Sequence, residues 1–567
     1  MIDYFSHVSA LRVCLQALKT SPPTDPAHKK AVPEALDAAA AQPGAAILGT
    51  LVDHLLQYSQ TATSVEIGIL TKAAALFADG VSILNKFAAI RPGLETGVTT
   101  PNAPGALAAY NAALAELPGL QTDLQNIYTK LEAFQATFSG NWIAPVGQQQ
   151  GTPVLQWDWR DVFLARRTTA FVASTQKLAA TSRQLAFAVG TLAGAAGNII
   201  GSGYLNSVVG GPRRSHTLRH RLAAYSVGAW LRDNEHALAS TLADIRHALT
   251  FGETGTLTLP SDLKTLAHDA LEKAYPTGTQ PLPDLETGYT NLMEHLKLLG
   301  EFTLPPVPAP MSNALTSKMI QAGVSPGVID LVGGAVSGIG TNYPQIGSHE
   351  NAGGVCLTLL SWLFFPPSLV IAIDDALGGG EGPDPSVGVS SSGLTAIGSS
   401  VSGLSAVNSL YGLATSFWQA LAAARTALVL RGLLYPNPDD LSSPTFAQFV
   451  SIPGILTRGY PLLSMPATDD GTAWPTSAVE TPVQIPAPFA VSSAPSVFLT
   501  GATDSVSATS SKLWEDMIEF PGRDLPGSAN LNLDADRGFA AHCWALDAGS
   551  TITTPPVLTT ALPYTGI

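Results

Sequence analysis

Apolar residues recur at helical spacing through most of the first 300 residues. Residues 63–90, "TSVEIGILTKAAALFADGVSILNKFAAI", open with Thr63 and Glu66 in the arrangement of a capping box and then keep an apolar residue every three or four positions, which predicts a helix. From Asp161 the pattern predicts one long helix buried among others. Its apolar positions, seven residues apart, are Leu164, Phe171, Leu178, Leu185 and Leu192. A further helix is predicted from a stripe of Leu231, Leu238, Leu242, Ile245 and Leu249.

Proline changes the pattern in the second half of the chain. The stretch "FTLPPVPAPMS", residues 302–312, interrupts the helices, and a helical pattern returns from about Leu394 to Leu434. Residues 436–495 contain eleven prolines beside short β-branched pieces, which indicates irregular structure with short strands. The predicted fold is mainly α, an α-rich α+β chain with long helices first and irregular Pro-rich segments later. The predicted regions are 1–301, helical; 302–434, helical with Gly and Pro interruptions; and 435–567, Pro-rich and irregular.

The most hydrophobic stretch, residues 355–373, is nineteen residues long and carries no charge. That length is enough to cross a bilayer as a helix, but a proline pair divides it into two short pieces and no Lys or Arg flanks it. We interpret it as a buried core or subunit-contact seam and expect no stable membrane insertion. The residues predicted to form this seam are Trp362, Phe364, Phe365, Pro366 and Pro367.

Charge is scarce in this chain. Of its 567 residues 46% are hydrophobic and only 13% are charged, against about 25% charged in a typical soluble domain. A monomer so poor in charge exposes neutral or apolar surface unless neighbours cover it, which favours extensive self-association. The net charge is −14, and the acidic excess lies after Met319, so a broad, tight grip on nucleic acid is not expected.

The three cysteines, Cys14, Cys356 and Cys543, are far apart and form no CxxC pair. They support neither a disulfide framework nor a zinc site, and we expect an intracellular protein with no cofactor and no metal. The chain begins without the basic and apolar pattern of a secretory signal.

The segment "RRSHTLRHR" is the one dense basic cluster. Its arginines, Arg213, Arg214, Arg219 and Arg221, have guanidinium groups that suit phosphate contacts, and the alternative is a solvated helix start after a Gly-Pro turn. "WDWR", residues 157–160, admits either base stacking or aromatic anchoring in a core, and the second is favoured. The hydrolase, kinase, dehydrogenase and metalloprotease signatures are missing, so we do not expect an enzyme.

In composition and order of elements the whole chain resembles the capsid proteins of fungal double-stranded RNA viruses of the partitivirus and totivirus kind. The resemblance implies a closed icosahedral shell of many copies, built from α-rich subunits paired as dimers and enclosing a genome and a polymerase. It also implies a virion component assembled in the host cytoplasm, with Arg213, Arg214, Arg219 and Arg221 facing the interior. Contact with RNA would be weak and non-specific, because the genome must move during internal transcription.

Two alternatives remain open from the sequence. One is a helical membrane-active protein, either pore-forming or injected, in which residues 355–373 form a concealed apolar hairpin that inserts after a conformational change. The other is an enzyme whose carboxylate site leaves no linear motif.

Overall fold

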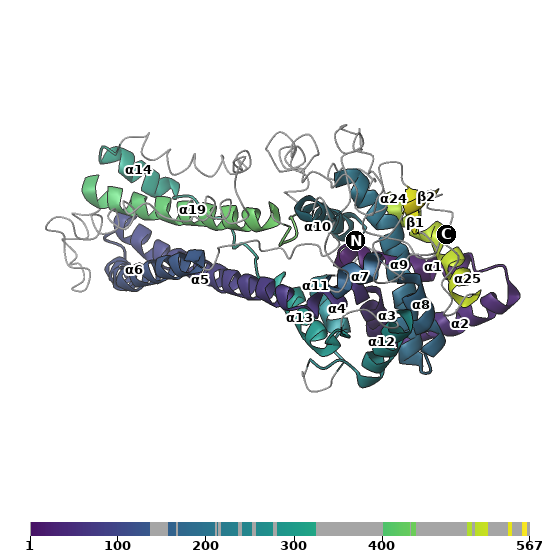
Figure 1. The fold of residues 1–567 in the computed structure, drawn as a ribbon. Coiled ribbons are helices and arrows are strands. Elements are labelled where there is room, and N and C mark those ends of the chain that lie inside the picture. The colour runs from purple at the N-terminus through teal and green to yellow at the C-terminus, as the bar shows by residue number, and fades with distance from the viewer. Residues whose placement is uncertain are drawn as a thin grey trace. The chain divides into compact units, whose positions relative to one another are not determined.

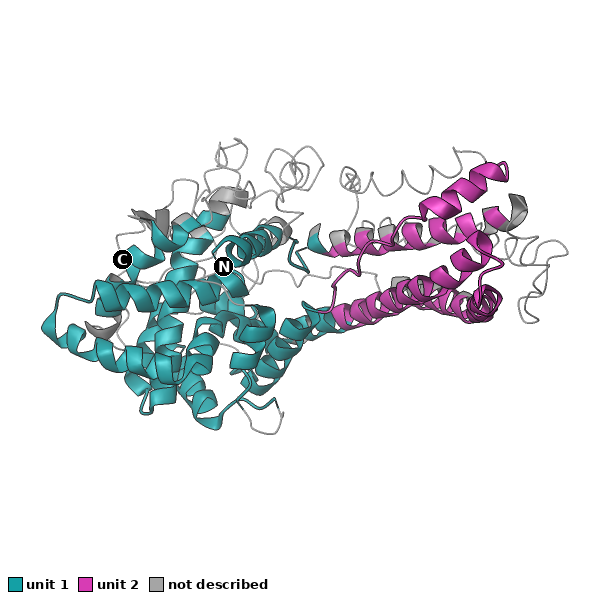
Figure 2. Cartoon of the chain, turned by 180° about the vertical axis from the view of Figure 1, so that it is seen from behind, with its two compact units in different colours: residues 1–68, 142–300, 429–567 teal, residues 69–141, 301–428 magenta. Residues whose placement is uncertain are grey.

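The structure is a computed structural model, and the description that follows covers only part of the chain. The described residues are 2–136, 157–165, 168–209, 213, 217–235, 241–251, 257–275, 281–324, 401–430, 432–437, 496–501, 505–519, 542–546 and 558–563. Helices dominate these residues, so the prediction of a mainly α protein is confirmed (Figure 1). The chain divides into two compact units, each assembled from separated segments (Figure 2).

Unit 1 combines residues 1–68, 142–300 and 429–567. Its helices are α1 (Tyr4–Thr20), α2 (Pro26–Ala41), α3 (Pro43–Thr50), α4 (Val52–Tyr58), α7 (Trp159–Ala165), α8 (Thr168–Leu178), α9 (Ser182–Val209), α10 (Thr217–Asn234), α11 (Leu242–Ala248), α12 (Ser261–Ala274), α13 (Leu285–Leu298), α24 (Val497–Thr500) and α25 (Val506–Glu519). Two strands, β1 (His542–Leu546) and β2 (Leu558–Pro563), pair antiparallel with His542 opposite Pro563.

Helix α9 is the centre of unit 1 and packs against α1, α2, α3, α8 and α25. Its crossing with α3 is made by glycines. A Cβ atom on Gly49 would overlap the carbonyl oxygen of Phe187, and one on Gly190 would overlap that of Ala46. Two backbones approach this closely only when the facing residues are very small. The small residues of α9 therefore decide how near α3 can lie.

Unit 2 combines residues 69–141 and 301–428. The long helix α5 (Thr61–Thr99) begins in the first segment of unit 1 and continues into unit 2, which also holds α6 (Ala106–Ala136), α14 (Asn313–Gln321) and α19 (Val401–Leu430). Helix α6 runs antiparallel to α5, because Lys86 pairs with Asp123 and Asp79 with Lys130. Helix α19 also runs along α5, and the Tyr411 hydroxyl donates to the Glu95 carboxylate.

The predicted helix over residues 63–90 is confirmed within α5, but the predicted capping box is wrong. The helix begins at Thr61, and the Thr63 hydroxyl donates 2.7 Å to the carbonyl of Gln57. The Glu66 carboxylate binds Arg221 and does not cap the helix. Glu66 forms a buried ion pair with Arg221 in place of the predicted capping contact with Thr63.

The single long helix predicted from Asp161 is also wrong, because the chain forms α7, α8 and α9 there. A side-chain cap separates α8 from α9: the Thr181 hydroxyl accepts from the Gln184 amide at 3.2 Å, and the Gln184 side chain accepts from the Ala180 amide at 2.9 Å. The first contact satisfies a free amide of the new helix start. The stripe from Leu231 to Leu249 likewise falls on two helices, α10 and α11. Leu249 is the C-cap of α11, and Leu238 lies outside the described residues.

The compact units divide the chain differently from the three consecutive regions, 1–301, 302–434 and 435–567, that we predicted. Unit 1 gathers residues from the first and last of them, and the boundary between Gly300 and Glu301 lies beside the Pro-rich stretch 302–312. The three regions stay a prediction about composition along the chain.

Candidate functional site

The first turn of α1 is buried and held by its own N-cap. Asp3 is 1% exposed, and its carboxylate accepts from the backbone amides of Phe5 at 3.0 Å and Ser6 at 3.2 Å. The Tyr435 hydroxyl donates to the same carboxylate at 2.8 Å. Burial raises the pKa of Asp3, while these hydrogen bonds act to lower it. Asp3 thereby fixes the start of α1 and the position of His7 one turn later.

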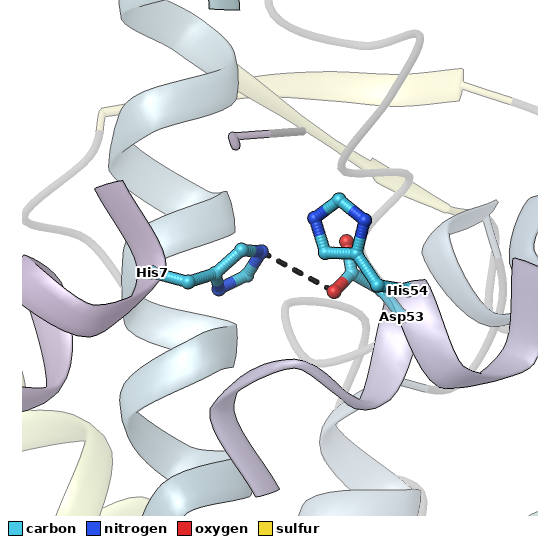
Figure 3. A group of neighbouring side chains, drawn as sticks. All are labelled: His7, Asp53 and His54. Atoms are coloured by element: carbon cyan, nitrogen blue, oxygen red, sulfur yellow. Dashed lines mark ion pairs between the residues drawn. The ribbon is translucent and has the colours of Figure 1, made fainter. Parts of the chain in front are cut away.

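His7, Asp53 and His54 form a compact cluster between α1 and α4 (Figure 3). Their side chains each offer one nitrogen or oxygen atom, and these atoms all lie within 4.8 Å of one another. His7 Nε2 is 3.2 Å from Asp53 Oδ1. All three residues are buried, with exposures between 0% and 5%.

Neighbouring polar groups hold the outer side of the cluster. Asp53 Oδ2 accepts from the Asn198 side-chain amide at 3.5 Å and lies 3.7 Å from a guanidinium nitrogen of Arg160. The same Asn198 accepts from the Ile2 amide at 3.2 Å. His54 Nε2 is 3.2 Å from the Ile2 carbonyl oxygen. Four separated segments of the chain therefore meet at Asp53 and His54.

Several ring and carboxylate atoms of the cluster have no hydrogen-bond partner among the residues that the structure describes. They are both ring nitrogens of His7, Nδ1 of His54 and Oδ1 of Asp53. Although His7 Nε2 and Asp53 Oδ1 face each other at 3.2 Å, the two groups lack the alignment of a hydrogen bond. Buried polar groups are nearly always paired, so these atoms call for an explanation.

Electrostatics favour an ionised Asp53 and a neutral His54 at neutral pH. Burial opposes the ionisation of Asp53, yet His7, His54 and Arg160 together hold its pKa well below the ordinary range. Burial, with Arg160 and His7 nearby, holds the pKa of His54 well below its ordinary value despite the attraction of Asp53. The cluster therefore presents a carboxylate beside a neutral imidazole with a free lone pair.

Tyr4, Tyr58 and His295 extend the polar contacts of the cluster beyond His54. The Tyr4 ring lies 4.5 Å from the His54 ring, and the Tyr4 hydroxyl is 2.9 Å from His295 Nδ1 and 3.2 Å from the Tyr58 hydroxyl. Burial, Arg221 and Arg160 depress the pKa of His295 well below its ordinary value. Residues from α1, α4 and α13 thus share one buried network.

The predicted basic cluster is only partly described. Arg213 is buried and paired with Asp161, and Arg221 binds the Glu66 carboxylate and donates to the Gly432 carbonyl oxygen. Arg214 lies outside the described residues, as does the side chain of Arg219. The two described guanidinium groups therefore neutralise internal carboxylates, and their contact with RNA stays a prediction.

The predicted apolar seam cannot be placed, because Trp362, Phe364, Phe365, Pro366 and Pro367 lie outside the described residues. The aromatic anchoring favoured for "WDWR" is confirmed: Trp157 and Trp159 are buried, and Trp159 Nε1 donates 2.7 Å to the Pro281 carbonyl oxygen. Arg160 of the same segment is buried beside Asp53.

Sequence reasoning missed the cluster of His7, Asp53 and His54. His7 and Asp53 are 46 positions apart and only the adjacent pair Asp53 and His54 stands out, so no linear metal or catalytic motif marks the three. Comparison with protein-family models, with curated proteins and with solved structures gives no match to this chain.

Proposed function

We propose that this chain is a structural, self-assembling protein, a capsid subunit that forms an icosahedral shell around a double-stranded RNA genome. The proposal rests first on the shortage of charge, with 13% charged residues in 567. Further copies of the same chain can cover the neutral and apolar surface that such a composition exposes. Its building block is a dimer, and its main partner is itself.

Helix α5 is the observation that carries this proposal. Only 39% of its most apolar 18-residue stretch is buried within one copy of the chain, whereas the corresponding stretch of α9 is 94% buried. Most exposed positions of α5 that follow one another at helical spacing are neutral, namely Thr71, Ala75, Ala78, Ser82, Asn85 and Ala89. Lys72 and Lys86 are exposed on the same helix. A face with so few charges suits contact with a second copy, because burying it removes little charge from water.

The charged residues of α5 within unit 2 are mostly engaged inside that unit. Asp79 and Lys86 pair with α6, the Arg91 guanidinium lies over the Tyr411 ring, and Glu95 accepts from the Tyr411 hydroxyl. Lys86 and Asp79 keep side-chain exposures of 47% and 40%, and Lys72 is exposed as well, so these contacts pair part of the charge of the helix without burying it. They favour the interpretation of α5 as a subunit-contact helix.

The remaining parts of the chain fit the same proposal. The Pro-rich stretch beyond residue 435, with its short strands, would run over neighbouring subunits as irregular structure. RNA contact would be weak and would rest on Arg214 and Arg219, since Arg213 and Arg221 are already paired with carboxylates.

Electron microscopy and light scattering of the purified full chain test this proposal. We expect closed particles of megadalton mass from the wild-type chain and a loss of particles in Ala78→Glu, which places a charge on the exposed face of α5. Ala40→Glu is the matched control: Ala40 is exposed on α2, and particles should persist. A wild-type chain that stays monomeric at high protein concentration would overturn the proposal.

A membrane-active protein is the second candidate function. Among the described helices, α5 and α9 are long and apolar enough to cross a membrane by length and composition. The exposed α5 favours this candidate more than the buried α9 does. Leakage of dye from liposomes at nanomolar protein, together with monomers in solution, would support it against the capsid proposal.

A further inference from the structure

The cluster of His7, Asp53 and His54 has the composition of a transition-metal site. Two imidazoles and one carboxylate are ligands that zinc and similar divalent ions accept, whereas calcium and magnesium prefer sites made of oxygen atoms. The three side chains come from two helices and lie beside one another, with ligand atoms within 4.8 Å of one another (Figure 3). The cluster is not merely a group of acidic residues, since two of its three members are imidazoles.

His7 and Asp53 have the spacing expected of two ligands around a metal ion, whereas His54 lies farther from Asp53 and would have to move closer to bind the same ion. Two ligands at about 2.0–2.1 Å from a tetrahedral zinc ion lie roughly 3.3 Å apart. His7 Nε2 and Asp53 Oδ1 lie 3.2 Å apart without the alignment of a hydrogen bond. A shared ion between them would satisfy both atoms at their present separation.

The unpartnered atoms of the cluster supply a second, independent observation. Both nitrogens of His7 and Nδ1 of His54 are buried and have no hydrogen-bond partner among the described residues. When His54 Nε2–H donates to the Ile2 carbonyl oxygen, Nδ1 keeps a lone pair to which no described group donates a hydrogen bond. A metal ion would accept one lone pair from each imidazole, whereas the second nitrogen of His7 carries a hydrogen that a metal ion does not bind.

Outer contacts of the kind found around metal sites are present. Ligand carboxylates are usually hydrogen-bonded through their second oxygen, and Asp53 Oδ2 faces Asn198 and Arg160. Metal binding also requires an ionised carboxylate and neutral imidazole.

We propose that His7, Asp53 and His54 bind one divalent transition-metal ion of the zinc type, which ties α1 to α4 inside unit 1. The three protein ligands leave one coordination position open. By joining residues far apart in the sequence, the ion stabilises the folded chain. Because the cluster is buried, the ion enters as the protein folds. This site is independent of the capsid proposal and is tested without reference to particles.

The experiment measures zinc in the full chain produced with Zn²⁺ in the growth medium. We expect one zinc ion per chain by inductively coupled plasma mass spectrometry, and loss of that zinc in His7→Gln and His54→Gln. His295→Gln is the matched control, since His295 is a buried histidine of the same network but not of the cluster, and it should keep its zinc. Wild-type chain without zinc, or zinc retained in both cluster variants, would overturn the proposal.

A second measurement on the unaltered sequence covers the case in which the variants fail to fold. Chain produced with Co²⁺ in place of Zn²⁺ should show visible absorption bands of a four- or five-coordinate cobalt site with nitrogen and oxygen ligands. The melting temperature of wild-type protein should also rise when the metal is present. A featureless visible spectrum together with an unchanged melting temperature would sink the proposal.

Discussion

Arg221 of α10 binds both carboxylate oxygens of Glu66, 155 residues earlier in the chain. The pair is largely buried, with side-chain exposures of 14% and 4%, and Arg221 also donates to the Gly432 carbonyl oxygen. One guanidinium thus joins three segments that the sequence keeps far apart. Its planar fork suits this task in a way that a lysine ammonium does not.

Removing one partner of this ion pair should be costly, because the other charge is then left buried. We expect Glu66→Gln to lower the free energy of unfolding by on the order of 3 kcal/mol in urea denaturation. The double variant Glu66→Leu with Arg221→Met should regain much of that loss, because it removes both charges together. An unchanged unfolding midpoint in Glu66→Gln would contradict the buried pairing.

The crossing of α3 and α9 should tolerate no side chain larger than glycine. A Cβ on Gly190 would overlap the Ala46 carbonyl oxygen, so we expect Gly190→Ala to lower the free energy of unfolding by about 2 kcal/mol or more. Gly68→Ala is the control within the same unit, because no atom lies within 4 Å of the added Cβ. There alanine should stabilise the helix by about 0.5–1 kcal/mol. Equal melting temperatures for the two variants would refute the close crossing.

Acid should destabilise the chain through His295. Its pKa is depressed by burial and by Arg221 and Arg160, so the folded protein keeps His295 neutral while the unfolded chain takes up a proton below its ordinary pKa of about 6.5. The stability that comes from keeping His295 neutral is fully present above about pH 6.5 and is lost as the pH falls below that value. In His295→Gln the decline in melting temperature from pH 7 to pH 5 should be shallower than in wild type. A decline as steep as in wild type would contradict a role for His295 in acid destabilisation.

Cys14 should be unreactive in the folded chain. It is fully buried, and burial raises the pKa of its thiol to about 11, so thiolate is scarce at neutral pH. In a Cys356→Ser, Cys543→Ser background, we expect Ellman's reagent to label Cys14 quickly in denaturant and only slowly in buffer. Rapid labelling in buffer would show that α1 opens more readily than its packing implies.

Local patterns explain which predictions succeeded. The apolar spacing of residues 63–90 was sufficient to predict the helix, because apolar residues at that spacing lie on one helix face and can be buried together. The same reasoning predicted one helix where α7, α8 and α9 form, because the apolar spacing from Leu164 to Leu192 continues across the breaks between them. The capping pair of Thr181 and Gln184 was visible in the sequence and would have marked the start of α9.

Long-range partners explain which predictions failed. Thr63 and Glu66 have the residues of a capping box, yet Glu66 gains more from a bidentate arginine than from one backbone amide. The basic segment around Arg213 reads as a phosphate-binding surface because the sequence does not reveal that Asp161 and Glu66 lie beside its arginines. The candidate metal site was missed for the same reason: His7 becomes a neighbour of Asp53 only through the packing of α1 against the rest of unit 1.

The sequence by itself determined that this protein is mainly helical, poor in charge and without the common catalytic motifs, because periodicity, propensity and composition are local properties of a chain. Only the tertiary structure decided that residues from both ends and the middle build unit 1, that two arginines of the basic segment face carboxylates, and that two histidines and an aspartate converge. The physical reason is that burial, close helix crossings and ion pairs depend on distances between residues far apart in sequence, and those distances exist only once the chain has folded.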